Sequence, residues 1–121
     1  MLKKTITYVD YNDVERKEDF YFNITKAEAM EMEMSVNGGL TALIDKIVST
    51  NDMPTLASYF KELILKAYGE KSLDGKRFVK SKEISEAFSQ TEAFSNLYME
   101  LLTDDKAAAD FFNGILPKPE K

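Results

Sequence analysis

The side chains that could act as catalytic groups in this sequence are carboxylates, because the chain contains no cysteine and no histidine. Without these residues there is no thiolate nucleophile, no imidazole base and no ligand set of the kind that zinc prefers. The composition therefore argues against Ser-His and Cys-His catalysis, against disulfide bonds and against a zinc site. An enzyme with this sequence would have to depend on acid–base chemistry between carboxyl groups.

The acidic pairs Glu83 and Glu86, and Asp104 and Asp105, are the candidates for such chemistry. Both pairs stand where a helix is expected to begin, and negative side chains there are stabilised by the positive end of the helix dipole. Capping or solvent exposure therefore explains them without catalysis. The sequence also lacks the glycine-rich phosphate loops, the nucleophile elbow and the calcium-binding loop. We predict no catalytic residue, no metal site and no cofactor.

The net charge of −5 comes from one part of the chain. Residues 81–116 hold seven acidic residues and two lysines, whereas the remainder has fourteen residues of each sign. An acidic helical half would repel a phosphate backbone, so we expect no nucleic acid partner. No apolar run approaches the roughly 20 residues of a membrane-spanning helix, and the first residues do not resemble a signal peptide. We expect a cytoplasmic protein without membrane association.

Residues 5–9, Thr-Ile-Thr-Tyr-Val, and 14–22, Val-Glu-Arg-Lys-Glu-Asp-Phe-Tyr-Phe, flank the turn-forming segment Asp10-Tyr11-Asn12-Asp13. This pattern predicts an N-terminal β-hairpin over about 5–22. The apolar side chains of both strands can share one face only if the numbers of paired residues add to an even total. We therefore predict a three-residue loop or a bulge near Asn12. Because a two-stranded ribbon is marginally stable alone, it must pack on helices or on another strand.

The segment after the hairpin predicts a helix that begins at Lys26 with a capping box. The Thr25 hydroxyl can accept a hydrogen bond from the Glu28 amide, and the Glu28 side chain can accept one from the Thr25 amide. Such a helix places Ala27, Met30 and Met34 on one face. The methionines of this segment indicate either ordinary core packing, which we favour, or an adaptable groove for a partner.

Two further helices are expected in the middle of the chain. Apolar residues recur at helical spacing over 40–48, after a glycine-containing break. A longer stripe follows over 56–67, with Pro54 suited to the first helical turn and Gly69 expected as the C-cap. The segment 70–80 is expected to be an exposed loop with the option of a hairpin.

Residues 81–102 carry two apolar faces that do not line up on one straight helix. Ser81 can cap a first helix, and Ser89-Gln90-Thr91-Glu92 has the form of a second capping box. We therefore predict a break near Ser89, which lets the two halves pack on different neighbours. The residues that we predict to form a partner or self-contact surface are Phe88, Phe94, Leu97 and Tyr98.

The end of the chain predicts one more helix. Thr103 is expected to cap a helix over 104–112, with Asn113-Gly114 as its stop. The predicted fold is α+β and mostly α, with an N-terminal β-hairpin followed by about five to six short helices around one core. We expect a single domain over 1–116 and a flexible tail over 117–121.

Short sequence segments along nearly the whole chain resemble those of one protein family. They are Asp10-Tyr11-Asn12, the stretch from Val14 to Asn23, Lys66-Ala67-Tyr68-Gly69-Glu70-Lys71-Ser72, the stretch from Phe78 to Phe94, and the ending Phe111-Phe112-Asn113-Gly114-Ile115-Leu116-Pro117. In these segments the sequence resembles tail assembly chaperones of long-tailed phages and prophages of Gram-positive bacteria. The resemblance implies a non-enzymatic protein in the cytoplasm of the bacterial host. It implies that the protein coats the tape measure protein, keeps it soluble and helps to recruit tail-tube subunits.

The physical reading of the sequence is compatible with this role. A chaperone for a long helical client needs apolar grooves, and an acidic rim would steer a basic partner. Self-association is also expected, since several copies along one client multiply weak contacts. Two alternatives remain: a structural tail or head-tail completion subunit of the virion, and a small phage-encoded inhibitor of a host defence protein whose acidic surface mimics nucleic acid.

Overall fold

The computed structural model describes residues 1–35, 49 and 52–116. In chain order the elements are β1 (Leu2–Val9), β2 (Glu15–Phe22), α1 (Lys26–Ser35), α3 (Met53–Ala67), β3 (Tyr68–Lys71), β4 (Phe78–Val79), α4 (Lys82–Ser89), α5 (Glu92–Thr103) and α6 (Asp105–Ile115). The fold is therefore α+β and mostly helical, as predicted. The helix expected over 40–48 and the tail over 117–121 lie outside the described residues, and the limits of the domain stay a prediction.

The N-terminal hairpin has the predicted even register. Strands β1 and β2 are antiparallel, and Leu2 lies opposite Phe22. The Asp10 amide donates to the Val14 carbonyl at 2.9 Å, which leaves a three-residue loop whose last residue, Asp13, has a φ of 61°. A turn followed by a left-handed residue is a common way to build such a loop. Even-numbered side chains of both strands consequently face the helices.

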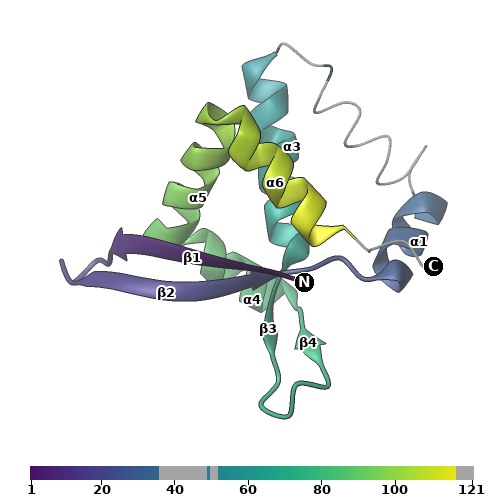
Figure 1. Ribbon diagram of the computed structural model, residues 1–121, viewed down its shortest axis with the longest axis horizontal. Coiled ribbons are helices and arrows are strands. Elements are labelled where there is room, and N and C mark those ends of the chain that lie inside the picture. The colour runs from purple at the N-terminus through teal and green to yellow at the C-terminus, as the bar shows by residue number, and fades with distance from the viewer. Residues whose placement is uncertain (36–48, 50–51, 117–121) are drawn as a thin grey trace.

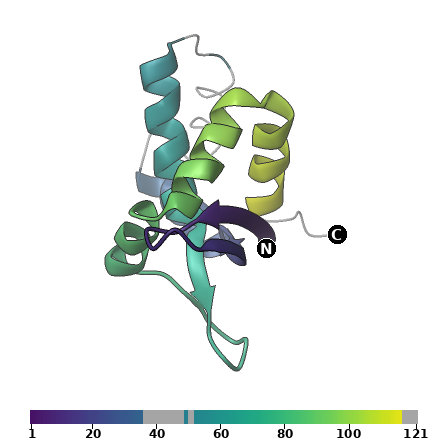
Figure 2. The same cartoon turned by 90° about the vertical axis from the view of Figure 1, so that its left-hand side faces the viewer.

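The sheet has the order β1-β2-β3-β4, but its two hairpins diverge. Strand β3 pairs with β2 only through Tyr21–Gly69 and Phe22–Tyr68, and then pairs with β4. Figure 1 shows the β3–β4 hairpin running away from the end of the β1–β2 ribbon. In Figure 2 the helices α3, α5 and α6 rise on one side of the ribbon, and the β3–β4 hairpin extends in the opposite direction.

Gly69 is not the C-cap of α3, contrary to the prediction. The helix ends at Ala67, and Tyr68 already has an extended backbone with φ −68° and ψ 140°. Gly69 lies in β3, where a Cβ atom would come within 2.7 Å of the Phe78 ring and 2.9 Å of the Val79 carbonyl oxygen. The close approach of β4, and not a helix end, is therefore what requires glycine at this position.

The capping box of α1 is confirmed in both directions. The Glu28 amide donates to Thr25 Oγ1 at 3.0 Å, and the Thr25 amide donates to Glu28 Oε1 at 2.9 Å. Ala27 and Met30 share a face of this helix, but Ala27 is exposed and Met30 is 59% exposed. Ala29 packs against the core instead. Core packing thus does not account for Met30, and the Met34 side chain lies outside the described part of the chain.

Residues 81–102 form two helices, as predicted, with the break at Gln90. Ser81 Oγ caps α4 by accepting a hydrogen bond from the Ile84 amide at 3.1 Å. The cap of α5 is Thr91, which accepts from the Phe94 amide at 3.1 Å. Ser89 does not cap α5, because its hydroxyl donates to the Glu86 carbonyl within α4.

The last helix differs from the prediction at both ends. Asp104, and not Thr103, is its N-cap and accepts two backbone hydrogen bonds at 3.0 and 3.1 Å. Thr103 belongs to α5 and donates to the Met99 carbonyl. The helix also continues through Gly114, where a Cβ atom would lie 2.9 Å from Leu2 Cδ1. The glycine thus permits β1 to approach the helix.

Buried side chains from both hairpins and from α3 to α6 form one core. Its largest fully buried members are Phe22, Ile24, Leu63, Ile64, Leu97, Leu101 and Ile115. Lys80 joins the end of β4 to the start of α1, because its ammonium lies 2.7 Å from Glu28 Oε2 and 2.6 Å from the Asn23 carbonyl oxygen.

Truncation of Leu63 should destabilise the fold strongly. Its side chain is 0% exposed in the core, and Leu63→Ala should lower the free energy of unfolding by about 2–5 kcal/mol. Leu73→Ala is the matched control, because Leu73 is fully exposed in the β3–β4 turn and should change stability by less than about 0.5 kcal/mol. Urea unfolding measures both; similar costs would contradict the assignment of the core.

Replacement of Glu28 by glutamine should flatten the acid side of the stability curve. Burial alone would raise the pKa of Glu28, but hydrogen bonds from Lys80 and the Thr25 amide outweigh it and lower the pKa below its ordinary value of 4.5. The ionised carboxylate therefore contributes stability above that value, and the contribution is lost as the pH falls through the folded pKa.

We expect the stability gap between wild type and Glu28→Gln to be fully present at neutral pH and to shrink below about pH 4.5. Urea unfolding across that range measures the gap. Glu86→Gln, which removes a carboxylate at an exposed position of α4, is the control for the charge change. A gap that is the same at every pH would show that the ion pair does not contribute in this way.

Candidate functional site

The four residues predicted to form a partner surface lie where α4 meets α5, and three of them fill the core. Phe88, Phe94 and Leu97 are 3%, 8% and 1% exposed. Tyr98 is half-buried, stacks on Phe94 with ring centroids 5.6 Å apart, and donates its hydroxyl to the Ala57 carbonyl at 3.0 Å. A partner could reach the three buried side chains only if the helices separated. Their contact with a partner stays a prediction, and the folded chain exposes only part of Tyr98 for it.

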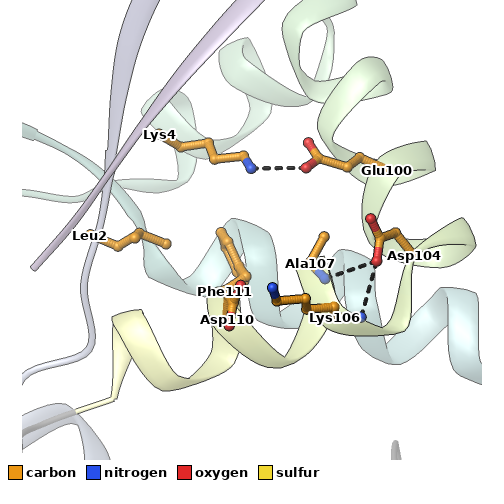
Figure 3. Close-up of a pocket in the computed structure, with 8 residues that line it drawn as sticks. All are labelled: Leu2, Lys4, Glu100, Asp104, Lys106, Ala107, Asp110 and Phe111. Atoms are coloured by element: carbon orange, nitrogen blue, oxygen red, sulfur yellow. Dashed lines mark hydrogen bonds and ion pairs between the residues drawn. The ribbon is translucent and has the colours of Figure 1, made fainter.

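Sequence reasoning missed a cleft between the start of β1 and the corner formed by α5 and α6 (Figure 3). The cleft has a volume of about 280 Å³ and is lined by Leu2, Lys4, Glu100, Asp104, Lys106, Ala107, Asp110 and Phe111. These residues come from opposite ends of the chain. Only the packing of the hairpin against the last helices brings them together, so local patterns could not reveal the cleft.

The floor of the cleft is apolar. Leu2 projects from β1 toward Phe111 of α6 in Figure 3, and Ala107 lies one helical turn before Phe111. Phe111 is itself buried and contacts Phe22 with ring centroids 5.2 Å apart. The floor is thus a continuation of the core that reaches the surface.

The rim of the cleft carries three carboxylates, from Glu100, Asp104 and Asp110, and two lysines, Lys4 and Lys106. Lys4 Nζ lies 2.9 Å from Glu100 Oε2, with both side chains partly exposed, and such a surface pair contributes at most about 1 kcal/mol. Asp104 is held by its capping hydrogen bonds. Asp110 has no ion-pair partner among residues 1–35, 49 and 52–116. The weak Lys4–Glu100 pair and the unpaired Asp110 leave carboxylates that a basic partner can bind.

The cleft combines an apolar surface with carboxylates. Within the described ranges, no group of three or more acidic residues could hold a metal ion. Every buried side-chain nitrogen or oxygen there has a hydrogen-bond partner. The described helices also include none that is long and apolar enough to cross a membrane. An apolar floor with carboxylates around it can accept an apolar side chain that is flanked by a lysine or an arginine.

The tip of the β1–β2 hairpin is a second exposed apolar feature. Val9, Tyr11 and Val14 are exposed there. The Asp10 carboxylate fixes the loop, because it accepts two loop amides at 2.8 and 3.0 Å and pairs with Arg16. The hydrogen bond from Arg16 is the main reason why the pKa of Asp10 lies below its usual value. The loop therefore presents its apolar side chains in a pre-organised form.

Two substitutions should distinguish a core role from a surface role at the α4–α5 junction. Because Phe88 is buried, Phe88→Ala should lower the free energy of unfolding by about 3–5 kcal/mol. Tyr98→Phe removes one hydrogen bond and should cost about 0.5–1.5 kcal/mol. Urea unfolding measures both costs. A loss below about 1 kcal/mol for Phe88→Ala would indicate a surface residue, as the sequence first suggested.

Comparison with known proteins places this fold in a family. A family model described as phage tail assembly chaperone matches residues 1–119, which include the hairpin, the cleft and all described helices. No curated protein and no solved structure matches the chain. The match extends over nearly all of the 121 residues and confirms the resemblance to tail assembly chaperones. The chain belongs to the phage tail assembly chaperone family.

Proposed function

We propose that this protein binds the tape measure protein of its phage and keeps it soluble while the tail tube assembles. The observation that carries the proposal is membership of the tail assembly chaperone family over residues 1–119. Membership favours a role in tail assembly over the alternatives of a virion subunit or a defence inhibitor. The identity of the client is the step that we add.

The cleft between β1 and α6 supports this choice of client. A long helical client presents amphipathic faces, and an apolar side chain from such a face fits against Leu2 and Phe111. A lysine or arginine on the next turn of the client helix would pair with Asp110, or would displace Lys4 as the ion-pair partner of Glu100. Because opposite charges steer encounter and fix register, the carboxylates of the rim favour a basic client segment over an acidic one.

The tail-tube protein and further copies of the same chain complete the proposed set of partners. A chaperone that covers a long client needs many copies, since neighbouring weak contacts then reinforce one another. The hairpin tip at Val9, Tyr11 and Val14 lies apart from the cleft and stays available for a tail-tube subunit or a neighbouring copy. Assembly takes place in the cytoplasm of the host, and no catalytic step is assigned to the chain.

Co-expression with the tape measure protein of the same phage tests the proposal. The client should be insoluble alone and soluble with the chaperone, and the two proteins should co-elute in size-exclusion chromatography. An insoluble client and no complex would refute the function. Persistence of the chain in purified virions in fixed stoichiometry would instead indicate a structural subunit.

Charge reversal in the cleft should weaken this complex. Asp110→Lys removes the unpaired carboxylate and repels a basic client segment, so the dissociation constant should rise about tenfold. Glu62→Lys, at an exposed acidic residue of α3 outside the cleft, makes the same charge change and should leave affinity within about twofold. Titration of the purified chaperone with a soluble client fragment measures both. Equal weakening by the two variants would show that net charge, and not the cleft, governs binding.

A further inference from the structure

The two edges of the β1–β2 ribbon differ. In this register even-numbered residues bond across the ribbon, and odd-numbered residues direct their amides and carbonyls outward. On the β1 side α5 lies along the edge, where Asn96 Nδ2 donates to the Thr7 carbonyl at 3.2 Å. On the β2 side the Asn23 amide donates to the Ala67 carbonyl at 2.8 Å, beyond the end of the strand. A helix therefore covers one edge, and β3 covers only the end of the other.

The outer edge of β2 is open from Glu15 to Phe20. Strand β3 pairs only with Tyr21 and Phe22, and no other described strand pairs with β2 on this side. The outward amides and carbonyls of Glu15, Lys17 and Asp19 consequently have no backbone partner in the described part of the chain. A row of such groups is a template for an additional strand.

A hollow lies beside this edge where β3 turns away. It has a volume of about 420 Å³ and is lined by residues 18–21 of β2 and 68–71 of β3. In Figure 1, α4 lies behind the end of β2 where β3 turns away, and no ribbon is drawn below the part of β2 nearer the hairpin loop. Phe20 and Tyr68 form an apolar floor, with ring centroids 6.4 Å apart. The open edge thus ends in a partly apolar hollow.

Glu18 and Glu70 are the carboxylates that line the hollow, and Glu18 already accepts a hydrogen bond from the Tyr8 hydroxyl and lies 3.7 Å from Arg16. Glu18 and Glu70 both lie near Tyr68; burial, and then these two charges, raise the pKa of that tyrosine to about 12. Glu70 has no ion-pair partner among residues 1–35, 49 and 52–116. On the outer side Lys71 is already placed over the Tyr21 ring, 4.4 Å from its centroid. A positive side chain that enters beside Glu70 would therefore be attracted.

A second copy of the same strand fits this edge badly. A symmetric antiparallel pairing centred on Lys17 places Lys17 opposite Lys17 and Glu15 opposite Asp19 on one face, and it places Arg16 opposite Glu18 on the other, so that like-charge pairs outnumber opposite-charge pairs. Like charges directly opposite one another destabilise a strand pair. The charged edge thus opposes self-pairing, which is a common protection against aggregation, but it admits a strand with complementary charges.

We propose that the outer edge of β2 binds an extended, lysine- or arginine-bearing segment of the client by strand addition. The incoming strand runs antiparallel to β2 and exchanges backbone hydrogen bonds with Lys17 and Asp19. Its basic side chain lies between Glu18 and Glu70 above the apolar floor. The identity of the client rests on the proposed function, whereas the binding mode rests on the open edge.

Proline substitution at two cross-strand partners tests the binding mode. Lys17 and Thr7 lie opposite one another, and each directs its amide outward, one to the open edge and one to the α5 side. Proline is tolerated at such positions because no ladder hydrogen bond is lost. Lys17→Pro should weaken binding of the soluble tape measure fragment at least about tenfold, while Thr7→Pro stays within about twofold of wild type.

Lys17→Ala retains the amide and should bind within about threefold of wild type, which separates the loss of the backbone donor from the loss of charge. Thermal unfolding checks that every variant is folded. If Lys17→Pro is folded and binds the client as wild type does, strand addition is refuted while the proposed function stands. If wild type itself does not bind the client, the proposed function fails.

Amide hydrogen exchange of the protein in the presence of a synthetic peptide tests strand addition at the β2 edge without the client. The probe is a short acetylated peptide that alternates lysine with valine, added to the full chain and followed by NMR. Slowed exchange at Glu15, Lys17 and Asp19, with Thr5 and Thr7 unchanged, supports the proposal. Unchanged exchange at the β2 amides overturns it. A Glu70→Lys variant should lose the protection, whereas Glu83→Lys, at an exposed position of α4, should keep it.

Discussion

The packing of Phe22 between the sheet and the helices is the interaction on which the rest of the structure depends. Its side chain is 0% exposed, and its ring centroid lies 5.6 Å from Tyr68, 5.8 Å from Phe88 and 5.2 Å from Phe111. These partners belong to β3, α4 and α6. A slip of one residue in the hairpin would turn Phe22 to solvent. The register of the hairpin and the packing of the helices therefore depend on each other.

This packing also determines which surfaces stay available. The cluster fixes the last residues of β2, where β3 pairs, and β3 then turns away, so that no described strand lies beside Glu15 to Phe20. At the other end of β1, Leu2 packs against Gly114 and forms one wall of the cleft. Strand edge and cleft thus arise from the same packing, and a chaperone with both could bind an extended and a helical segment of one client.

Local signals predicted the parts of this fold that depend on neighbours in sequence. The capping box at Thr25, the even hairpin register and the break before Thr91 follow from hydrogen bonds and side-chain alternation within short segments. Gly69 and Gly114 were misassigned, since contacts with β4 and β1 explain them. The partner residues and the cleft could not be predicted either. An apolar helical stripe looks the same whether it faces a core or a partner, and the cleft joins distant parts of the chain.

Hydrogen exchange of the free chaperone and of its complex with the proposed client, the tape measure protein, locates the surfaces that bind. Exchange should slow in two places, along β2 from Glu15 to Asp19 and at the cleft on α6 around Asp110, with little change in the core helix α3. Protection confined to the exposed face of α3, or no protection anywhere in a stable complex, would contradict the proposed binding surfaces.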